Sequence, residues 1–213
     1  MAPPAMSMNK VIHGALRRDL ERFRRALEEF PEGDVVRAAG LHRAWRNFED
    51  QLTEHHEGEH AIAWPALSAI GVDSLTIASF DGEHAAMAAD LAAASRAMDT
   101  LAATAGRHDA DAAAVAVTRL QATAVSHLDH EEQETEDALN RNSGHPAMKE
   151  MGRQFRRRSS PSEAGTFFVW VQDGASPAEL AALRDNVPGP VLAVVGTVFG
   201  RRYRREVAPV WAG

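Results

Sequence analysis

Residues 11–140 contain one pattern of histidine and glutamate twice. In each half, a histidine is followed about 42 residues later by a second histidine, and a glutamate comes four residues after the second. The six residues are His13, His55 and Glu59 in the first half, and His84, His127 and Glu131 in the second. With ten His and 17 Glu in 213 residues, about one HxxxE match is expected by chance, but a second match at the same spacing indicates an internal duplication.

Apolar residues recur at three- and four-residue spacing around this pattern, which predicts four amphipathic helices. Each of the six repeated residues falls on a predicted buried face. These faces comprise positions 13, 16, 20, 23, 27 and 30; positions 45, 48, 52, 55, 59 and 62; positions 80, 84, 87, 91, 94, 98 and 101; and positions 117, 120, 124, 127, 131, 134 and 138. Breaks at 31–33 and 142–144 separate helical segments, and Trp64-Pro65 is interpreted as the end of the second helix.

The predicted fold class is therefore all-α, with an up-down-up-down four-helix bundle over residues 8–142. Its interior would hold four imidazoles and at least two carboxylates. Burying an unpaired carboxylate among apolar side chains is costly or forces it to take up a proton, so these groups need a common partner. A metal centre is such a partner. Because histidine and glutamate at i and i+4 share a helix face, one glutamate from each half could bridge two ions.

Composition limits which metals the chain could bind and where in the cell we expect it. The chain has no cysteine, which excludes disulfides, thiolate zinc sites and cysteine nucleophiles. Imidazole with carboxylate suits iron or manganese, and zinc could replace them in a recombinant preparation. The first residues, MAPPAMSMNK, lack an apolar leader, and no apolar run approaches the roughly 18 residues of a membrane span. We therefore expect a cytoplasmic protein without a membrane partner.

The order of these motifs is similar to that of a known family. A histidine, then HHxxE ahead of WPAL, then Glu-His and finally HxxHEE resemble the hemerythrin-like cation-binding (HHE) domain family. The resemblance covers about residues 11–140 and implies a four-helix bundle with two non-haem iron ions joined by an oxo or hydroxo bridge. It also implies chemistry with oxygen, hydrogen peroxide or nitric oxide, or iron handling. Carried over residue by residue, the implied ligands are His13, His55, Glu59, His84, His127 and Glu131.

The sequence departs from the oxygen-carrying proteins that it resembles. They carry a second histidine four residues after the histidine of the third helix, where this chain has Ala88. They also carry a carboxylate five residues after the last histidine. Glu132 stands at that position, but the match to the first repeat favours Glu131. Six protein ligands rather than seven leave a position for solvent, an exogenous ligand or another side chain, which favours redox chemistry over reversible oxygen carriage.

Other polar residues near the pattern are weaker candidates. Three histidines lie at the edge of the buried faces or beyond it, where a surface role or a contact to a ligand is the favoured interpretation and a spare ligand is the alternative: His56, His60 and His130. Three glutamates are expected to be solvated: Glu54, Glu57 and Glu132. Three histidines outside the constellation are assigned no role: His42, His108 and His145.

Residues 145–213 form a second predicted region of accessory helices. Residues 143–213 contain 10 Lys and Arg against 6 Asp and Glu, whereas residues 1–142 contain 13 against 24. Helical patterns cover MKEMGRQFRRR, FFVWVQDG, SPAELAALRDN and VLAVVGTVFGRRYRREVAPVW. The arginine clusters are expected to be solvated or salt-bridged, and the total charge of −7 argues against a nucleic-acid partner. The sequence leaves the oligomeric state open.

Two functions are consistent with these features. The first is enzymatic: a di-iron centre that reacts with hydrogen peroxide, oxygen or nitric oxide in oxidative or nitrosative stress defence. The second is a non-catalytic sensor or carrier of oxygen, nitric oxide or iron, in which the C-terminal helices pass the state of the centre to a partner. Turnover of hydrogen peroxide distinguishes these two functions. The third alternative is a metal-free helical scaffold, which would bind no iron.

Overall fold

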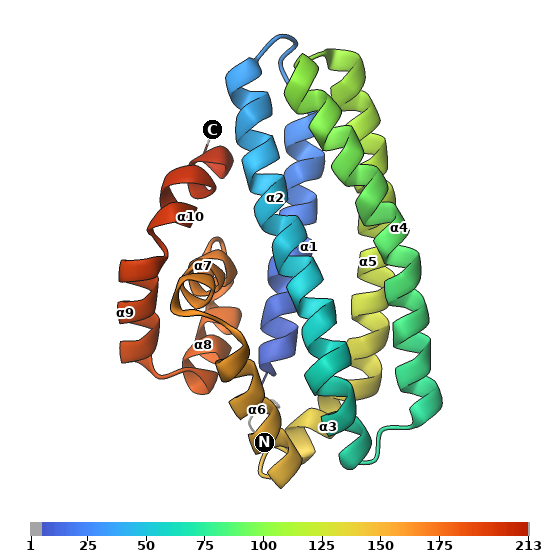
Figure 1. The fold of residues 1–213 in the computed structure, drawn as a ribbon, viewed down its shortest axis with the longest axis vertical. Coiled ribbons are helices and arrows are strands. Elements are labelled where there is room, and N and C mark those ends of the chain that lie inside the picture. Colours follow the sequence, from blue (N-terminus) through green and yellow to red (C-terminus); the bar gives the residue numbers. More distant parts are fainter. Residues whose placement is uncertain (1–5, 213) are drawn as a thin grey trace.

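In the computed structural model, which describes residues 6–212, every regular element of that range is a helix. Four long helices form the bundle shown in Figure 1: α1 (Met8–Glu28), α2 (Val35–Gly58), α4 (Ser74–Thr104) and α5 (Arg107–Arg141). The short helix α3 (Trp64–Ala69) lies at one end of the bundle. The predicted all-α four-helix bundle is confirmed. None of the helices within residues 6–212 is both long and apolar enough to cross a membrane.

Local signals begin and end the bundle helices. Ser7, Asp34 and Asp73 precede α1, α2 and α4, and each side chain accepts a hydrogen bond from a backbone N–H of the first turn. The loop between α1 and α2 contains Gly33 at a φ of 80°, a conformation that glycine adopts without strain. The Gly33 N–H donates to the carbonyl of Ala105, in the loop between α4 and α5, at 2.8 Å. The two loops are therefore tied together at the end of the bundle opposite α3.

The second helix does not end at Trp64-Pro65, so that prediction is wrong. A π-helical turn, η1 (Glu59–Ala63), follows α2 directly and leads into α3. The Trp64 N–H donates to the carbonyl of Glu59, five residues back, which is the π pattern. Pro65 lies in the first turn of α3, where its missing N–H leaves no helical hydrogen bond unmade. The wide turn therefore begins at one of the repeated carboxylates.

The predicted apolar faces pack together inside the bundle. Phe23, Trp45 and Phe48 are fully buried, and their ring centroids lie 5.1 to 5.9 Å apart. The predicted face of the last bundle helix is wrong at one position, because Thr135 is buried there and Glu134 is exposed. The Thr135 hydroxyl donates to a backbone carbonyl one turn earlier at 2.7 Å, which satisfies this polar group inside the bundle.

Shorter helices follow along one side of the bundle (Figure 1): α6 (Pro146–Arg158), α7 (Pro161–Gln172), α8 (Pro177–Asn186), α9 (Gly189–Phe199), α10 (Arg201–Glu206) and the 3-10 turn η2 (Ala208–Trp211). The single helix predicted over the last of these segments is thus broken at Gly200. A Cβ atom on Gly200 would lie 2.2 Å from the Val169 side chain, and one on Gly165 would lie 2.7 Å from the backbone of Phe199. Glycine at these two positions therefore lets α7 and α9 approach closely.

A buried polar cluster holds the C-terminal helices against α1. Asp19 accepts hydrogen bonds from Trp170 Nε1 at 2.7 Å and from Arg22 at 3.1 Å. Arg22 also donates to Asp173 at 3.3 Å, and the Tyr203 hydroxyl donates to the same carboxylate at 2.8 Å. The helix that carries the first repeated histidine is therefore bonded directly to α7 and, through Asp173, to α10.

Candidate metal centre

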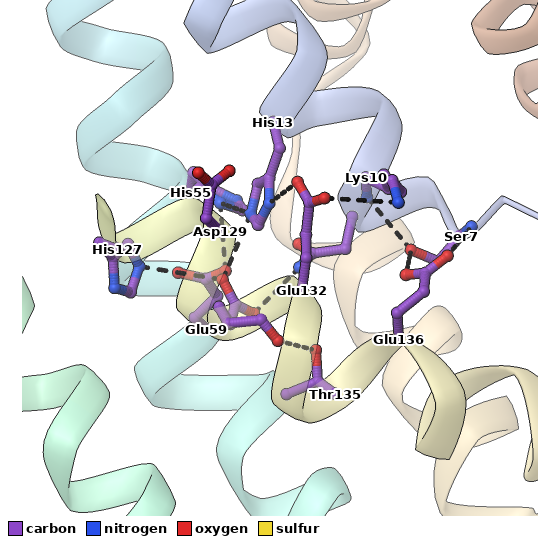
Figure 2. Close-up of polar contacts among 12 residues, drawn as sticks. Ser7, Lys10, His13, His55, Glu59, His127, Asp129, Glu132, Thr135 and Glu136 are labelled. Carbon is purple, nitrogen blue, oxygen red and sulfur yellow. Dashed lines mark hydrogen bonds and ion pairs between the residues drawn. The ribbon is translucent and has the colours of Figure 1, made fainter. Parts of the chain in front are cut away.

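The six repeated residues converge inside the bundle. They come from different elements: His13 from α1, His55 from α2, Glu59 from η1, His84 from α4, and His127 and Glu131 from α5. Four of them, namely His13, Glu59, His127 and Glu131, are at most 2% exposed. Figure 2 shows His13, His55, Glu59 and His127 around one point between the helices. The two hairpins thus bring the same residue types together from opposite sides.

Together with His56, these six residues supply ligand-type atoms that form two overlapping groups of four. We call them the first group, which consists of His13, His55, Glu59 and Glu131, and the second group, which consists of His56, Glu59, His84 and His127. Within each group, one ligand atom of each residue lies within 4.8 Å of the others. Because Glu59 belongs to both groups, two ions held by them would share its carboxylate.

The Glu59 carboxylate lies between histidines of the two halves. Its Oε1 is 3.1 Å from Nε2 of His55, one turn earlier in the chain, and its Oε2 is 3.4 Å from Nε2 of His84. Both oxygens are buried without a hydrogen-bond partner. A carboxylate whose two oxygens each face a different imidazole is placed to bridge two cations.

The Glu131 carboxylate occupies the equivalent position in the second half. Its Oε2 is 3.3 Å from Nε2 of His13 and 3.8 Å from Nε2 of His127, and this oxygen is also buried without a hydrogen bond. Its Oε1 accepts a hydrogen bond from Asn9 Nδ2 at 2.9 Å. One oxygen is therefore anchored by the protein, while the other is left facing the histidines.

The imidazoles face one another through Nε2. His13 Nε2 is 3.1 Å from His55 Nε2, and His84 Nε2 is 2.9 Å from His127 Nε2. The Nε2 atom of His56 is buried and has no hydrogen-bond partner. Buried polar atoms are normally paired, so this concentration of unpaired nitrogen and oxygen atoms fits a bound cation that accepts their lone pairs.

Burial sets the charge state of these side chains. It lowers the pKa of His55 and His56 far below the usual value and that of His84 to about 4, which leaves neutral imidazoles at pH 7. Burial, and then the neighbouring carboxylate, raises the pKa of Glu59 well above its usual value. Burial opposes ionisation of Glu131 too, but hydrogen bonds and charges of neighbouring histidines outweigh it and lower its pKa. A cation would remove the cost of ionising Glu59.

Two carboxylates outside the groups orient two of the histidines. His13 Nδ1 lies 3.0 Å from Glu132, a contact drawn in Figure 2, and His127 Nδ1 lies 2.7 Å from Glu83. Because an ionised carboxylate can only accept, the proton must be on Nδ1, and Nε2 keeps its lone pair toward the centre. Arg17 donates to Glu132 at 2.6 Å and holds it in place.

Sequence reasoning underrated three of these residues. The helical wheel puts His56 at the edge of its buried face, yet its long side chain reaches the second group. The expectation that Glu132 is solvated is wrong, because its side chain is 13% exposed and contacts His13. The repeat does not predict Glu83, since the equivalent position of the first repeat is Ile12, although Glu83 is the glutamate of the Glu-His pair in the motif order. The adjacency of two histidines in HHxxE was the one local sign of an additional ligand.

The other two edge histidines lie outside both groups. The side chain of His60 is 72% exposed and contacts Asp81 at 3.2 Å. His130 contacts Glu83 at 2.8 Å, so it reaches the centre only through the carboxylate that also holds His127. Their places agree with the favoured interpretation of a surface role for His60 and an indirect contact for His130.

A comparison with known protein families matches the segment that carries both groups. A family model described as the hemerythrin HHE cation-binding domain matches residues 9–139. The chain belongs to this family. No curated protein and no solved structure matches it. The match spans the elements from α1 to α5 that carry both groups, so the resemblance inferred from the repeat is confirmed, and the protein is a metal-binding member of the hemerythrin HHE family.

Proposed function

We propose that this hemerythrin HHE protein holds two iron ions and reacts with hydrogen peroxide, oxygen or nitric oxide in oxidative or nitrosative stress defence. The observation that carries the proposal is the pair of overlapping groups in which both Glu59 oxygens and Oε2 of Glu131 are buried without hydrogen bonds. Membership of a cation-binding family supports a metal there. A donor set of imidazole and carboxylate without thiolate suits iron or manganese, and the resemblance to the hemerythrin-like family implies iron.

In this proposal each group holds one ion. His13, His55 and Glu131 would hold the first ion, and the Glu59 carboxylate, which belongs to both groups, would be shared between the two. The ligands proposed for the second ion are His84 and His127, with His56 as an additional ligand that the sequence pattern alone did not assign. His56 qualifies because its buried Nε2 has no other partner and lies within the second group.

Two bound iron ions supply two-electron redox chemistry toward a small ligand. The contribution of the chain is to fix the tautomers of His13 and His127 through their Nδ1 contacts, and to exclude bulk water. Burial also keeps His55, His56 and His84 neutral by lowering the pKa of each. Four apolar side chains lie three residues from the repeated histidines on the same helix faces and are at most 1% exposed: Leu16, Leu52, Met87 and Ala124. An apolar environment that excludes water strengthens the electrostatic interactions between charged groups inside the centre.

Stopped-flow mixing of the iron-loaded protein with hydrogen peroxide and with nitric oxide tests this function. We expect consumption of at least one of them, with loss of the reaction in Glu59→Ala and Glu131→Ala. His108→Ala serves as the control, because His108 belongs to neither group. An iron-loaded protein that leaves both molecules unchanged, and that also fails to consume oxygen when its iron is reduced, would contradict the proposed function.

One observation favours the alternative function of a sensor or carrier. The buried contact between Asp19 and Trp170 joins α1, the helix of His13, to the C-terminal helices. We propose that residues 145–213 form an accessory region separate from the bundle of residues 8–142, and that a change at the centre could reach it through α1. A spectrum that changes reversibly with oxygen, without peroxide turnover, would favour this alternative.

A further inference from the structure

The two repeated glutamates differ in the contacts of their carboxylates, although the repeat makes their positions equivalent. Both oxygens of Glu59 are buried without a hydrogen bond, and they lie 3.1 Å from Nε2 of His55 and 3.4 Å from Nε2 of His84, which belong to different groups. Oε1 of Glu131 instead accepts a hydrogen bond from Nδ2 of Asn9 at 2.9 Å. Only one oxygen of Glu131 is therefore left for a cation.

The free oxygen of Glu131 faces the first group. Asn9 lies one turn before His13 on α1, so the two side chains share a face of that helix. Because an ionised carboxylate can only accept, the amide nitrogen of Asn9 must point toward it. The other oxygen, Oε2, is 3.3 Å from Nε2 of His13 but 3.8 Å from Nε2 of His127, and Glu131 belongs to the first group only. Side chains of α1 thus contact both oxygens of Glu131.

The equivalent position of the second hairpin holds an apolar ring. A shift of 71 residues, from His13 to His84, relates the first helices of the two hairpins, and the same shift places Phe80 opposite Asn9. The Phe80 ring is fully buried, with its centroid 6.1 Å from that of the His127 ring. A phenyl ring carries no N–H or O–H group. The exchange of an amide for a phenyl ring between the halves therefore accounts for the different contacts of the two carboxylates.

We propose that Asn9 is a positioning residue that restricts Glu131 to binding the first ion through one oxygen, so that Glu59 alone bridges the two ions. The repeat by itself would allow one bridge from each half. The inference rests on the proposed function in that it requires an ion at each group. The first ion then has two carboxylate and two imidazole donors, whereas the second has one carboxylate and three imidazoles. The two ions are therefore held by unlike donor sets.

Chelator competition with ferrous iron under nitrogen tests the positioning role, because it gives the affinities of the two ions without any oxidant. Asn9→Leu keeps the approximate size of the side chain and removes the donor. We expect it to change the ratio of the two affinities about tenfold or more, because the first ion loses an oriented ligand and the second loses none. Asn9→Gln keeps an amide donor and should recover part of the change. Asn47→Leu is the matched control, since the buried Nδ2 of Asn47 has no hydrogen-bond partner and Asn47 lies in neither group.

Infrared difference spectra of the same proteins, with and without iron, report how the carboxylates bind. A bridging carboxylate has a smaller separation between its antisymmetric and symmetric stretching bands than a carboxylate bound through one oxygen. We expect both kinds of band pair in the wild type. The pair from one-oxygen binding should disappear in Asn9→Leu, in which Glu131 regains both oxygens. A residue that only packed at position 9 would leave these bands unchanged.

An unchanged affinity ratio in Asn9→Leu, or one-oxygen bands that persist in it, would overturn the inference. A wild type that shows bridging bands alone, or that holds a single ion, would overturn it as well. If Asn9→Leu does not fold, Asn9→Ala removes the same donor without adding bulk and is judged by the same criteria. Failure of the peroxide, oxygen and nitric oxide reactions would refute the proposed function and leave both measurements readable, so the two failures are distinguishable.

Discussion

The Glu59 carboxylate of the first hairpin lies 3.4 Å from Nε2 of His84 in the second hairpin. The relationship is reciprocal, because Glu131 of the second hairpin lies 3.3 Å from Nε2 of His13 in the first. Neither hairpin alone therefore completes either group. Binding of metal and packing of the two halves are linked, and metal binding should stabilise the whole bundle rather than one helix.

Replacing His56 by alanine tests the ligand that the repeat did not assign. His56→Ala removes a buried imidazole from the second group only, so we expect iron content to fall from about two atoms per chain toward about one. Metal analysis of purified protein provides the measurement. His60→Ala, in the same stretch but with a 72% exposed side chain, should keep its full iron content. Full iron in His56→Ala would mean that His56 is not a ligand.

Glu59→Gln should stabilise the metal-free protein at neutral pH although it weakens metal binding. The raised pKa of Glu59 means that the folded state binds this proton more tightly than the unfolded chain, whose glutamate pKa is near 4.5. The contribution of Glu59 to the unfolding free energy is therefore fully present below pH 4.5 and is lost as pH rises toward the folded pKa. Glutamine has no such proton to lose.

Melting temperatures of chelator-treated proteins at pH 5 and pH 7.5 measure this effect. We expect Glu59→Gln to melt higher than the wild type at pH 7.5, by about 2–4 °C for each kcal/mol of charge burial removed, and the difference to shrink at pH 5. Glu134→Gln, at an exposed position of α5, should behave like the wild type at both pH values. A wild type as stable as Glu59→Gln at pH 7.5 would contradict the raised pKa.

Glu132→Ala should weaken metal binding without removing a ligand. The carboxylate accepts from Nδ1 of His13 and fixes the lone pair of its Nε2, and losing such a contact typically lowers metal affinity about 10–100-fold. Competition with a chelator of known affinity gives the ratio. Glu132→Gln should recover part of the loss, because its amide oxygen can still accept. Equal affinities for Glu132→Ala and the wild type would show that His13 is oriented without Glu132.

Asp19→Ala should loosen the C-terminal helices from α1. It leaves the buried Trp170 N–H without its partner, at a cost of about 1–3 kcal/mol in unfolding free energy, and it removes one of the contacts of Arg22. Urea unfolding followed by tryptophan fluorescence measures this cost. Asp137→Ala removes an exposed pairing with Arg141 and should change stability by less than about 0.5 kcal/mol. Equal stabilities of the two variants would refute a docking role for Asp19.

The sequence was sufficient to predict the bundle and the six repeated positions. Helical periodicity is local, and histidine and glutamate four residues apart must share a face, so His55 with Glu59 and His127 with Glu131 could be placed inward from spacing alone. The duplication then required the two hairpins to meet. These inferences need no knowledge of how one helix is rotated against another.

The remaining features depend on packing between elements. Glu132 and Glu83 reach His13 and His127 from different helices, and nothing in the local sequence encodes which carboxylate meets which imidazole. The close approach at Gly200 likewise depends on a neighbouring element, because a Cβ atom there would lie 2.2 Å from the Val169 side chain of α7.

Iron analysis combined with an optical spectrum of protein purified from iron-fed cells tests the central claim most directly. Because Glu59 is common to both groups, we expect about two iron atoms per chain and a near-ultraviolet absorption from a bridged ferric pair. One metal atom per chain without this absorption, or no iron at all, would contradict a di-iron centre built from the two overlapping groups.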